Sequence, residues 1–347
     1  MSLNILCLCN PLLDISVDVN QEFLDKYGLK GGNAILTDDN FPTNAFFGEL
    51  VANPSVQYIA GGSAMNTARV AAWTLQEPGK VAYLGAVGKD NYARTLSDYA
   101  SKSGVDVSGL LEVDDGTPTG LCGVCIVGKE RSMVANLAAS NKFNISQMST
   151  PIVQALKEKA GLVYASGFSL TVCPEAGLQL AQMCQAKGLV FSLNMSAPFI
   201  MQFFKDPLEK LLPFTNLIFC NEDEAKCLAQ MFGWDASLTV PQIAAKVIGD
   251  KKLSQQGRQI VCFTQGKEPT VIYTSDEGEL LVPVAPIDGS LIIDTNGAGD
   301  AFVGGFLAML AQGKPLKRCA EVGNYTAGVV IQHSGCQYPT NPTLPAE

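Results

Sequence analysis

A glycine-rich turn near the C-terminal end joins an apolar strand to an apolar helix and carries one carboxylate, Asp300, at the start of that helix. Backbone N–H groups at a helix N-terminus have no partner within the helix and lie at the positive end of its dipole, so they form an anion site. The predicted anion site is built from the amides of Gly297, Ala298 and Gly299. A carboxylate beside a bound anion weakens binding unless it takes part in the chemistry. We therefore expect Asp300 to be a general base for a hydroxyl that attacks a phosphate.

The alternative is that Asp300 only caps its helix and that the glycines only form a tight turn. Two features weigh against it. The helix expected over 301–310 is apolar nearly all round and therefore buried, and two further polar groups, Asp294 and Asn296, crowd the same turn. The helix N-terminus should lower the pKa of Asp300 below the usual value of about 3.9. The turn around Asp294 is also a candidate site for a potassium ion.

Two more segments place polar residues or glycines after a predicted strand or before a predicted helix. Asp14 follows the first predicted strand, over 4–9, although the preceding Asn-Pro pair also favours a simple turn. Paired glycines at 61–62 precede an apolar helix expected over 67–75. They either leave Ser63 as an ordinary N-cap or let the backbone approach a small polar ligand.

Acidic and glycine-bearing turns follow two later strands. Asn221 and Glu224 bracket an acidic first helical turn, which is commonly only a complement to the helix dipole. If the cleft holds a nucleoside triphosphate, these two residues would instead order the water shell of a Mg2+ ion. Thr264 to Gly266 forms a third glycine-bearing turn after the next strand.

Strand-like apolar runs alternate with amphipathic helical stretches through much of the chain. This alternation predicts an α/β fold with a parallel sheet between helices. Ligands of such sheets bind at the carboxyl ends of the strands. The predicted strands cover 162–166, 190–194, 217–220 and 259–263, and the predicted helices cover 174–186, 199–212 and 222–231.

Two regions, 15–37 and 117–136, break this alternation. Short alternating stretches at 123–127 and 131–135 are joined by a turn at Gly128, which indicates a hairpin. We expect the two regions to form a small antiparallel sheet that acts as a lid over the cleft. The predicted large domain consists of residues 1–14, 38–116 and 137–347.

Composition bounds the class of protein. The 347 residues are 47% hydrophobic and 16% charged, which suits one large domain with a smaller one attached. Apolar runs are strand-length and fall short of the about 20 residues that span a bilayer. The N-terminal apolar run lacks a basic flank and is interrupted, so we expect no signal peptide and a cytoplasmic location, with a nuclear pool as a further option. A net charge of −9 without a basic run argues against nucleic-acid partners.

Cysteine usage and missing motifs narrow the class further. The eleven cysteines lack the density of a disulfide scaffold and are expected to be reduced core residues. Cys122 and Cys125 form a CxxC pair on a predicted strand, with no second pair, so zinc or redox chemistry is disfavoured. The chain has neither a P-loop nor the Gly-x-Gly-x-x-Gly of dinucleotide-binding domains, which disfavours a nicotinamide oxidoreductase.

Three motifs together resemble the signatures of the ribokinase-like (pfkB) carbohydrate kinase family. They are Gly61-Gly-Ser-Ala-Met-Asn66, Asn221-Glu-Asp-Glu224 and Asp294-Thr-Asn-Gly-Ala-Gly-Asp300-Ala-Phe302, and their order and spacing match over nearly the whole chain. The resemblance implies a three-layer ribokinase-like domain with a mostly parallel central sheet and a small β-sheet lid domain. It also implies ATP as co-substrate and Mg2+ as cofactor, with K+ as an option.

Other segments resemble the members of that family that phosphorylate adenosine. These segments are Asn10-Pro-Leu-Leu-Asp14, Pro118-Thr-Gly-Leu-Cys122, Val134-Ala-Asn-Leu-Ala-Ala-Ser-Asn141, Gly167-Phe168, Asn194-Met-Ser-Ala-Pro-Phe199 and Gly335-Cys336. The implied reaction, a step of purine salvage, is ATP-dependent phosphorylation of the adenosine 5'-hydroxyl to give AMP and ADP. Asp300 would be its general base.

The resemblance also implies roles for individual residues. Asp14 would hold the ribose hydroxyls, Arg131 would reach the transferring phosphate, and Glu224 would act on Mg2+ through water. The residues implied to contact the nucleoside are Asn10, Asp14, Gly62, Ser63, Asn66, Cys122, Met133, Ala135, Phe168 and Phe199. Those implied on the ATP side are Asn221, Thr264, Gly266 and Asn296.

Alternatives to this function stay open at this point. A kinase for another nucleoside or a free sugar is the nearest, although an apolar lid favours a flat base. A non-catalytic nucleoside sensor is a second, against which the intact Asp300 speaks. A monomer is expected from the resemblance, with a lid-mediated dimer as the alternative.

Overall fold

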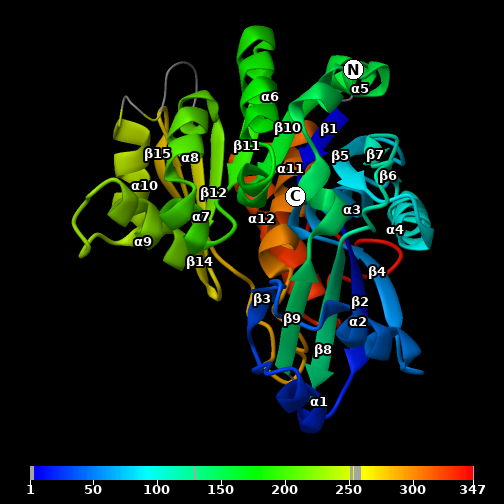
Figure 1. Ribbon diagram of the computed structural model, residues 1–347. Coiled ribbons are helices and arrows are strands. Elements are labelled where there is room, and N and C mark those ends of the chain that lie inside the picture. The colour runs from blue at the N-terminus through cyan, green and yellow to red at the C-terminus, as the bar shows by residue number, and fades with distance from the viewer. Residues whose placement is uncertain (1–3, 129, 251–252, 254–258, 347) are drawn as a thin grey trace.

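The computed structural model describes residues 4–128, 130–250, 253 and 259–346. Its centre is a ten-stranded sheet with the order β15-β14-β13-β12-β11-β10-β1-β5-β6, and β7 pairs with β5 (Figure 1). The strands of this main sheet are β1 (Asn4–Leu8), β5 (Val81–Val87), β6 (Val105–Asp106), β7 (Leu110–Glu112), β10 (Ala160–Ser166), β11 (Val190–Asn194), β12 (Leu217–Asn221), β13 (Ile260–Gln265), β14 (Glu268–Thr274) and β15 (Gly278–Val282).

The main sheet is parallel from β6 to β13 and ends in two antiparallel pairings, β13 with β14 and β14 with β15. Its central strands are apolar throughout because both faces are covered: every residue of β5 and β10 is buried. One apolar cluster on the sheet includes Tyr83 and Tyr164, and a second one includes Leu84 and Val163. Because neighbouring residues of a strand point to opposite faces, these are the two faces of one sheet.

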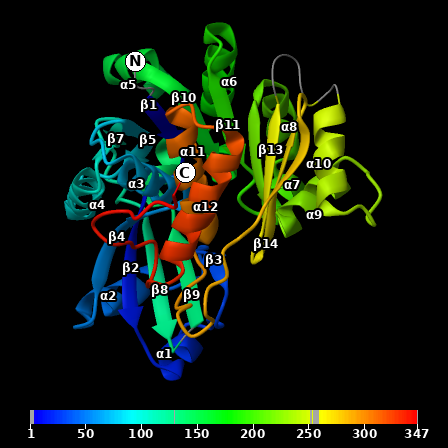
Figure 2. The same ribbon diagram turned by 180° about the vertical axis from the view of Figure 1, so that it is seen from behind.

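Helices cover both faces of the main sheet. On one face lie α3 (Ser63–Leu75), α4 (Asn91–Lys102), α11 (Ala298–Ala311) and α12 (Leu316–Val330), whose buried side chains join the first cluster. On the other face lie α5 (Pro151–Lys159), α6 (Pro174–Lys187), α7 (Pro198–Phe203), α8 (Lys205–Leu211), α9 (Glu222–Met231) and α10 (Val240–Gly249). Figure 2 shows α12 in front of the sheet, on the side opposite α6. Short 3-10 helices are η1 (Ala138–Lys142), η2 (Ile145–Ser149), η3 (Gly167–Thr171) and η4 (Leu212–Phe214).

A second, five-stranded sheet has the order β3-β9-β8-β2-β4 and stands off the main sheet (Figure 1). Its strands are β2 (Leu12–Asp18), β3 (Ala34–Leu36), β4 (Gln57–Gly61), β8 (Leu121–Val127) and β9 (Glu130–Asn136). The helices α1 (Gln21–Lys26) and α2 (Thr43–Ala52) accompany it. Aromatic rings from these helices pack in edge contacts, for example Phe46 against Tyr27 with centroids 5.0 Å apart.

The small sheet differs from the prediction in two ways. The predicted hairpin of β8 and β9 is confirmed, but β2 pairs with β8 in parallel, so the sheet is mixed and not antiparallel. Both strands leave the main domain side by side, as the bond from the Leu13 N–H to the Gly120 carbonyl shows, and they therefore run in the same direction. The sheet also includes β4, which lies outside the two predicted lid segments. The predicted domain boundaries stay a prediction.

Most predicted elements of the main domain are confirmed, and one helix is broken. The stretch 199–212 forms α7 and α8, with Phe204 ending one and preceding the other. Pro207 explains the break because its ring nitrogen has no hydrogen to donate to the carbonyl of Phe203, so a helix restarts just before it. All eleven cysteines are free, and all but Cys227 are buried, as predicted. No helix in the described residues has the length and hydropathy to cross a membrane.

Candidate functional site

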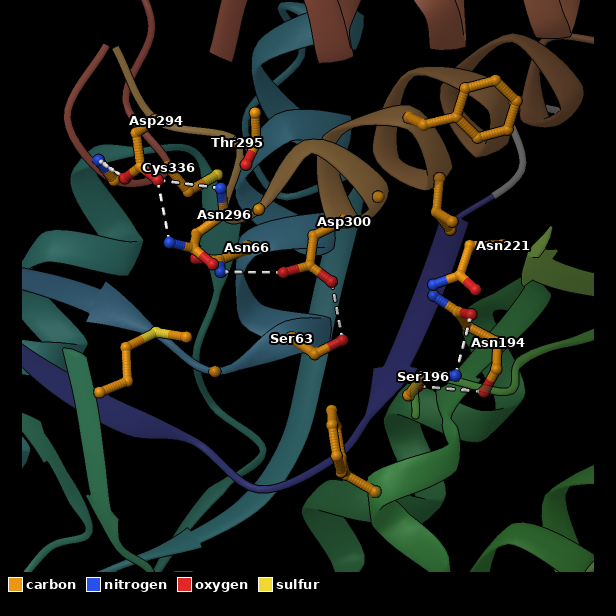
Figure 3. Close-up of a pocket in the computed structure, with 18 of the residues that line it drawn as sticks. Ser63, Asn66, Asn194, Ser196, Asn221, Asp294, Thr295, Asn296, Asp300 and Cys336 are labelled. Atoms are coloured by element: carbon orange, nitrogen blue, oxygen red, sulfur yellow. Dashed lines mark hydrogen bonds between the residues drawn. The ribbon is translucent and has the colours of Figure 1, made fainter. Parts of the chain in front are cut away.

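A cavity of about 460 Å³ opens where the carboxyl ends of the main-sheet strands face the small sheet (Figure 3). Both sheets and the start of α11 contribute to its wall. Of the residues predicted from the sequence, the wall contains Asp14, Gly62, Ser63, Asn66, Cys122, Arg131, Met133, Phe168, Asn221, Glu224, Thr264, Asn296, Gly297, Gly299 and Asp300. The structure thus brings fifteen of the predicted residues to one cavity.

The glycine-rich turn has the backbone that an anion site requires. Gly297 is the N-cap of α11 with φ 78°, a left-handed conformation that favours glycine. Gly299 faces open space, since an added Cβ there would meet no atom within 4 Å. The amide of Ala298 donates to the carbonyl of Thr295 at 3.3 Å, a long bond that an anion would have to displace. The open approach therefore lies over Gly299, because a Cβ on Gly297 would lie 3.4 Å from the Cβ of Cys336.

Asp300 is the third residue of α11, and its side chain is held by another helix. The hydroxyl of Ser63 donates to Oδ1 at 2.8 Å and the amide of Asn66 donates to Oδ2 at 3.0 Å (Figure 3). Since Gly297 is the N-cap, Asp300 is not a cap of its own helix. Burial raises the pKa of Asp300 to about 6, against the lowering effect of these two hydrogen bonds. The expected lowering was wrong because desolvation outweighs the helix terminus.

Asp14 lies on β2 and its carboxylate sits against the backbone of Gly61. A Cβ on Gly61 would come within 2.1 Å of the Asp14 carboxylate, so only glycine leaves room for this side chain. Burial raises the pKa of Asp14 to about 7, with the charge of Arg69 acting to lower it and the charge of Asp300 acting to raise it. Gly62 adopts φ +90° with an added Cβ 2.6 Å from the carbonyl oxygen of Asn10. Asn10 is thus buried behind the glycine pair rather than at the cavity wall.

Arg131 of β9 is buried and forms an ion pair with Asp294, its Nε lying 2.6 Å from Oδ2. Its Nη2 donates to the hydroxyl of Ser334 at 2.9 Å, whereas Nη1 has no hydrogen-bond partner in the described chain. The amide of Gly335 also donates to Asp294 Oδ2, and both nitrogens of Asn296 donate to Oδ1. Because a guanidinium and three N–H donors already occupy Asp294, its surroundings do not fit the predicted potassium ion.

Asn221 and Glu224 cap the start of α9 reciprocally. The Asn221 side chain accepts from the Glu224 amide at 2.8 Å, and Glu224 accepts from the Asn221 backbone and side chain at 2.9 and 3.0 Å. Burial raises the pKa of Glu224 to about 7. Thr264 stands opposite Asn221 on the adjacent strand and also reaches the cavity. Gly266 instead occupies the exposed turn between β13 and β14 and is not part of the wall.

The side of the cavity formed by the small sheet and η3 is apolar. Cys122, Met133 and Phe168 line it, and Ala135 lies opposite Cys122 on the paired strand and packs against the same apolar cluster. Phe199 supports Phe168 from outside the wall, with ring centroids 5.9 Å apart. This side can therefore cover a flat, largely apolar group.

Several wall residues were given no individual role from the sequence, although their segments were part of the resemblance. Asn194 ends β11 and Ser196 follows it, with a left-handed backbone at φ +67°. Asn194 Oδ1 accepts the backbone N–H of Ser196 at 3.1 Å (Figure 3). The strand-end rule that identified Asn221 applies equally to Asn194. Cys336 reaches the wall from beyond α12; the segment Gly335-Cys336 was part of the resemblance, but no strand end or helix start marks it.

The described residues contain no cluster of three or more His, Cys, Asp or Glu side chains that could hold a metal ion. The chain matches the pattern of the pfkB family carbohydrate kinases over residues 21–344. It belongs to this family.

Within the pfkB family, the chain is similar over its length to adenosine kinases. It is 44% identical to adenosine kinase 1 of Arabidopsis thaliana, over 96% of this chain and 95% of that protein. The structure of adenosine kinase from Trypanosoma brucei brucei superposes with a TM-score of 0.90 at 41% identity, covering 96% and 100% of the two chains. Adenosine kinase of Anopheles gambiae, solved with P1,P4-di(adenosine-5) tetraphosphate, gives a TM-score of 0.85 at 37% identity over 99% and 98%.

Proposed function

We propose that this chain transfers the terminal phosphoryl group of ATP to the 5'-hydroxyl of adenosine, giving AMP and ADP. The observation that carries this proposal is that one cavity is lined by Asp14 from the small sheet, by Asp300 from α11 and by Gly297 and Gly299 of the glycine-rich turn. The relative from Anopheles gambiae supports it, because the compound named with that protein joins two adenosines through a polyphosphate.

At the nucleoside end, the ionised carboxylate of Asp14 would accept hydrogen bonds from two ribose hydroxyls. Asn66 would donate or accept alongside it, and the backbone of Gly62 would allow close approach of the sugar. Met133 and Phe168 would enclose the base and exclude water. We propose that the small sheet acts as a lid in this way, and that the protein works as a monomer.

At the reacting end, the 5'-oxygen would attack the γ-phosphorus as the bond from that phosphorus to the β,γ-bridging oxygen breaks. The hydroxyl proton would pass to Asp300, and ADP would leave with the bridging oxygen. With a pKa of about 6, Asp300 is mostly ionised at neutral pH and is still basic enough to receive this proton late in the transfer. The amides at 297–299 and the free Nη1 of Arg131 would stabilise charge on the transferring group.

A Mg2+ ion would fit the part of the cavity lined by Glu224 and Asn221, because both side chains carry oxygen atoms that can bind the ion or its water shell. Burial raises the pKa of the Glu224 carboxyl to about 7, so a nearby cation would favour its ionised form. When bound with ATP, the ion supplies charge neutralisation on the phosphates. Glu224 would hold its water shell, consistent with the few protein ligands that Mg2+ usually takes.

The alternatives are a kinase for another nucleoside or free sugar and a non-catalytic nucleoside sensor. ADP release should be measured with adenosine, guanosine, inosine, ribose and fructose as acceptors at equal concentrations. Adenosine should give the highest kcat/KM. Preference for a free sugar would refute the nucleoside assignment, and binding of adenosine without ADP release from any acceptor would identify a sensor.

A further inference from the structure

Arg69 is a buried cation whose contacts lie outside the proposed chemistry. It projects from α3, is 2% exposed, and donates through Nη1 to the Ala60 carbonyl at 2.9 Å and through Nη2 to the Cys336 carbonyl at 3.1 Å. Its guanidinium lies between the rings of Tyr99 and Tyr338, 4.8 and 5.6 Å from their centroids. Burying a guanidinium costs desolvation free energy, which its hydrogen bonds must offset.

The first carbonyl that accepts from Arg69 belongs to Ala60 on β4, the strand that pairs with the Asp14-bearing strand β2. Ala60 pairs with Leu13 across β4 and β2, which places it beside the residue that carries the ribose-binding carboxylate. The next residue is Gly61, whose backbone the Asp14 carboxylate touches. Arg69 therefore fixes the surface against which Asp14 rests, and it provides the positive charge that acts on that carboxylate.

The second carbonyl belongs to a segment that also holds the phosphate end. Within residues 334–336, the hydroxyl of Ser334 accepts from Arg131, the amide of Gly335 donates to Asp294, and Cys336 lines the cavity. Asp294 in turn pairs with Arg131. The segment 334–336 is thus held by two buried arginines, one on α3 and one on the small sheet.

We propose that Arg69 is a positioning residue that couples the two ends of the cavity. Its side chain holds both β4, which pairs with the strand that carries Asp14, and the segment 334–336, which contacts Asp294 and Arg131. This proposal rests on the proposed function, because the ends it couples are those that would bind ribose and phosphate. Loosening Arg69 would then displace both ends together, with losses in adenosine binding and in turnover.

The charges that act on Asp14 are few. The ionisable groups facing it are Arg69 from α3, Asp300 from α11, Cys122 from β8 and Cys336 from the C-terminal segment. Burial raises the pKa of Cys122 well above its usual value and that of Cys336 to about 12, so both thiols are neutral in the working range. Removing the charge of Arg69 should therefore move the titration of Asp14 to higher pH.

The variants Arg69→Met and Arg69→Lys test the proposal against a matched control, Trp73→Phe. Trp73 stacks on Tyr338, just beyond the segment 334–336, with centroids 4.7 Å apart, and its indole N–H has no hydrogen-bond partner in the described chain. Circular dichroism should establish folding, and kcat and KM for adenosine and ATP should be measured below the lowest Tm.

We expect Arg69→Met to lose at least about tenfold in kcat/KM for adenosine, because the bonds from the charged donor to the Ala60 and Cys336 carbonyls are removed, together with a longer one to the Ser103 hydroxyl. Its acid limb of kcat/KM should also shift to higher pH. Arg69→Lys keeps the charge and should leave that limb in place while recovering part of the activity. Trp73→Phe should lower Tm and keep both kcat/KM and the limb. A folded Arg69→Met with unchanged kinetics and pH profile, or a Trp73→Phe variant with the same losses, would overturn the proposal.

A double variant tests the coupling and stays decisive if Arg69→Met does not fold. Arg69→Lys combined with Asp294→Asn should cost little more than the worse single change, since both disturb the same segment. Losses that multiply would show independent roles and refute the coupling. Whether the wild-type protein turns over adenosine tests the proposed function by itself. The coupling is tested by the ratio of variant to wild-type activity, which can be measured with any acceptor that the wild type phosphorylates.

Discussion

Ser63 and Asp300 are 237 residues apart in the sequence, and the Ser63 hydroxyl donates to Asp300 Oδ1 at 2.8 Å. The contact exists because the first turn of α3 packs against the first turns of α11. Gly304 permits this close packing, as an added Cβ there would lie 2.7 Å from the carbonyl oxygen of Thr67. The proposed base is therefore aimed by a helix pair, not by the loop that precedes it.

Asp300→Asn should reduce kcat by at least about a hundredfold and leave adenosine binding largely intact, because the amide keeps the shape of the side chain and cannot take a proton. Turnover by ADP release and binding by calorimetry check this. A variant with near-normal turnover would remove Asp300 from the role of base.

The same variant should be more stable than the wild type at pH 8. Burial raises the pKa of Asp300 to about 6 in the folded state, above the value of an unfolded aspartate, so its charged form destabilises the fold. That cost is present above pH 6 and disappears as the pH falls through 6 toward about 4. The gain in Tm of Asp300→Asn should therefore shrink between pH 8 and pH 5. A gain that grows on acidification would contradict the sign.

The pH profile should have an acid limb set by two carboxylates. Asp14 and Asp300 have pKa values of about 7 and about 6, and both are needed in the ionised form, so kcat/KM for adenosine should fall as the pH drops below 7 and fall more steeply below 6. At saturating adenosine, kcat should retain only the limb of Asp300, because bound ribose keeps Asp14 ionised. Flat kcat/KM from pH 5.5 to 8 would exclude both assignments.

The strand-end rule explains why much of the site was predictable. Asn221 and Thr264 each stand at or next to the end of a main-sheet strand, and in a largely parallel sheet these ends meet at one edge. Asp14 follows β1 by six residues and reaches the same cavity from β2 of the small sheet. Asp300 was predictable because it is a carboxylate at the start of a buried apolar helix, directly after glycines that suit an anion. Such features are local, since strand period and turn chemistry are encoded within about ten residues.

Contacts between distant segments were not predictable in the same way. Nothing near Arg69 indicates that it bonds to the carbonyl of Cys336, which is 267 residues away. The pairing of Arg131 with Asp294 likewise depends on how the two sheets are placed. The raised pKa of Asp300 follows from the same packing, because desolvation is a property of the assembled site.

Gly61→Ala should abolish tight adenosine binding. Its Cβ would come within 2.1 Å of the Asp14 carboxylate, which would have to leave the ribose site. Gly48→Ala on α2 is the matched control: no atom lies within 4 Å of its Cβ, and alanine should stabilise that helix by about 1 kcal/mol. Calorimetric titration with adenosine checks both variants. Wild-type affinity in Gly61→Ala would remove Asp14 from the ribose site.

Glu224→Gln should raise the free Mg2+ concentration needed for half-maximal activity by about tenfold, since an outer-shell partner of a metal typically contributes this much. Glutamine retains an oxygen that accepts from the Asn221 amide, so the cap of α9 should survive and Tm should not fall. Glu222→Gln is the matched control, because Glu222 lies in the same first turn and is exposed. ADP release is measured against free Mg2+ at fixed ATP. An unchanged Mg2+ requirement in Glu224→Gln, or an equal shift in Glu222→Gln, would show that Glu224 only caps its helix and complements its dipole.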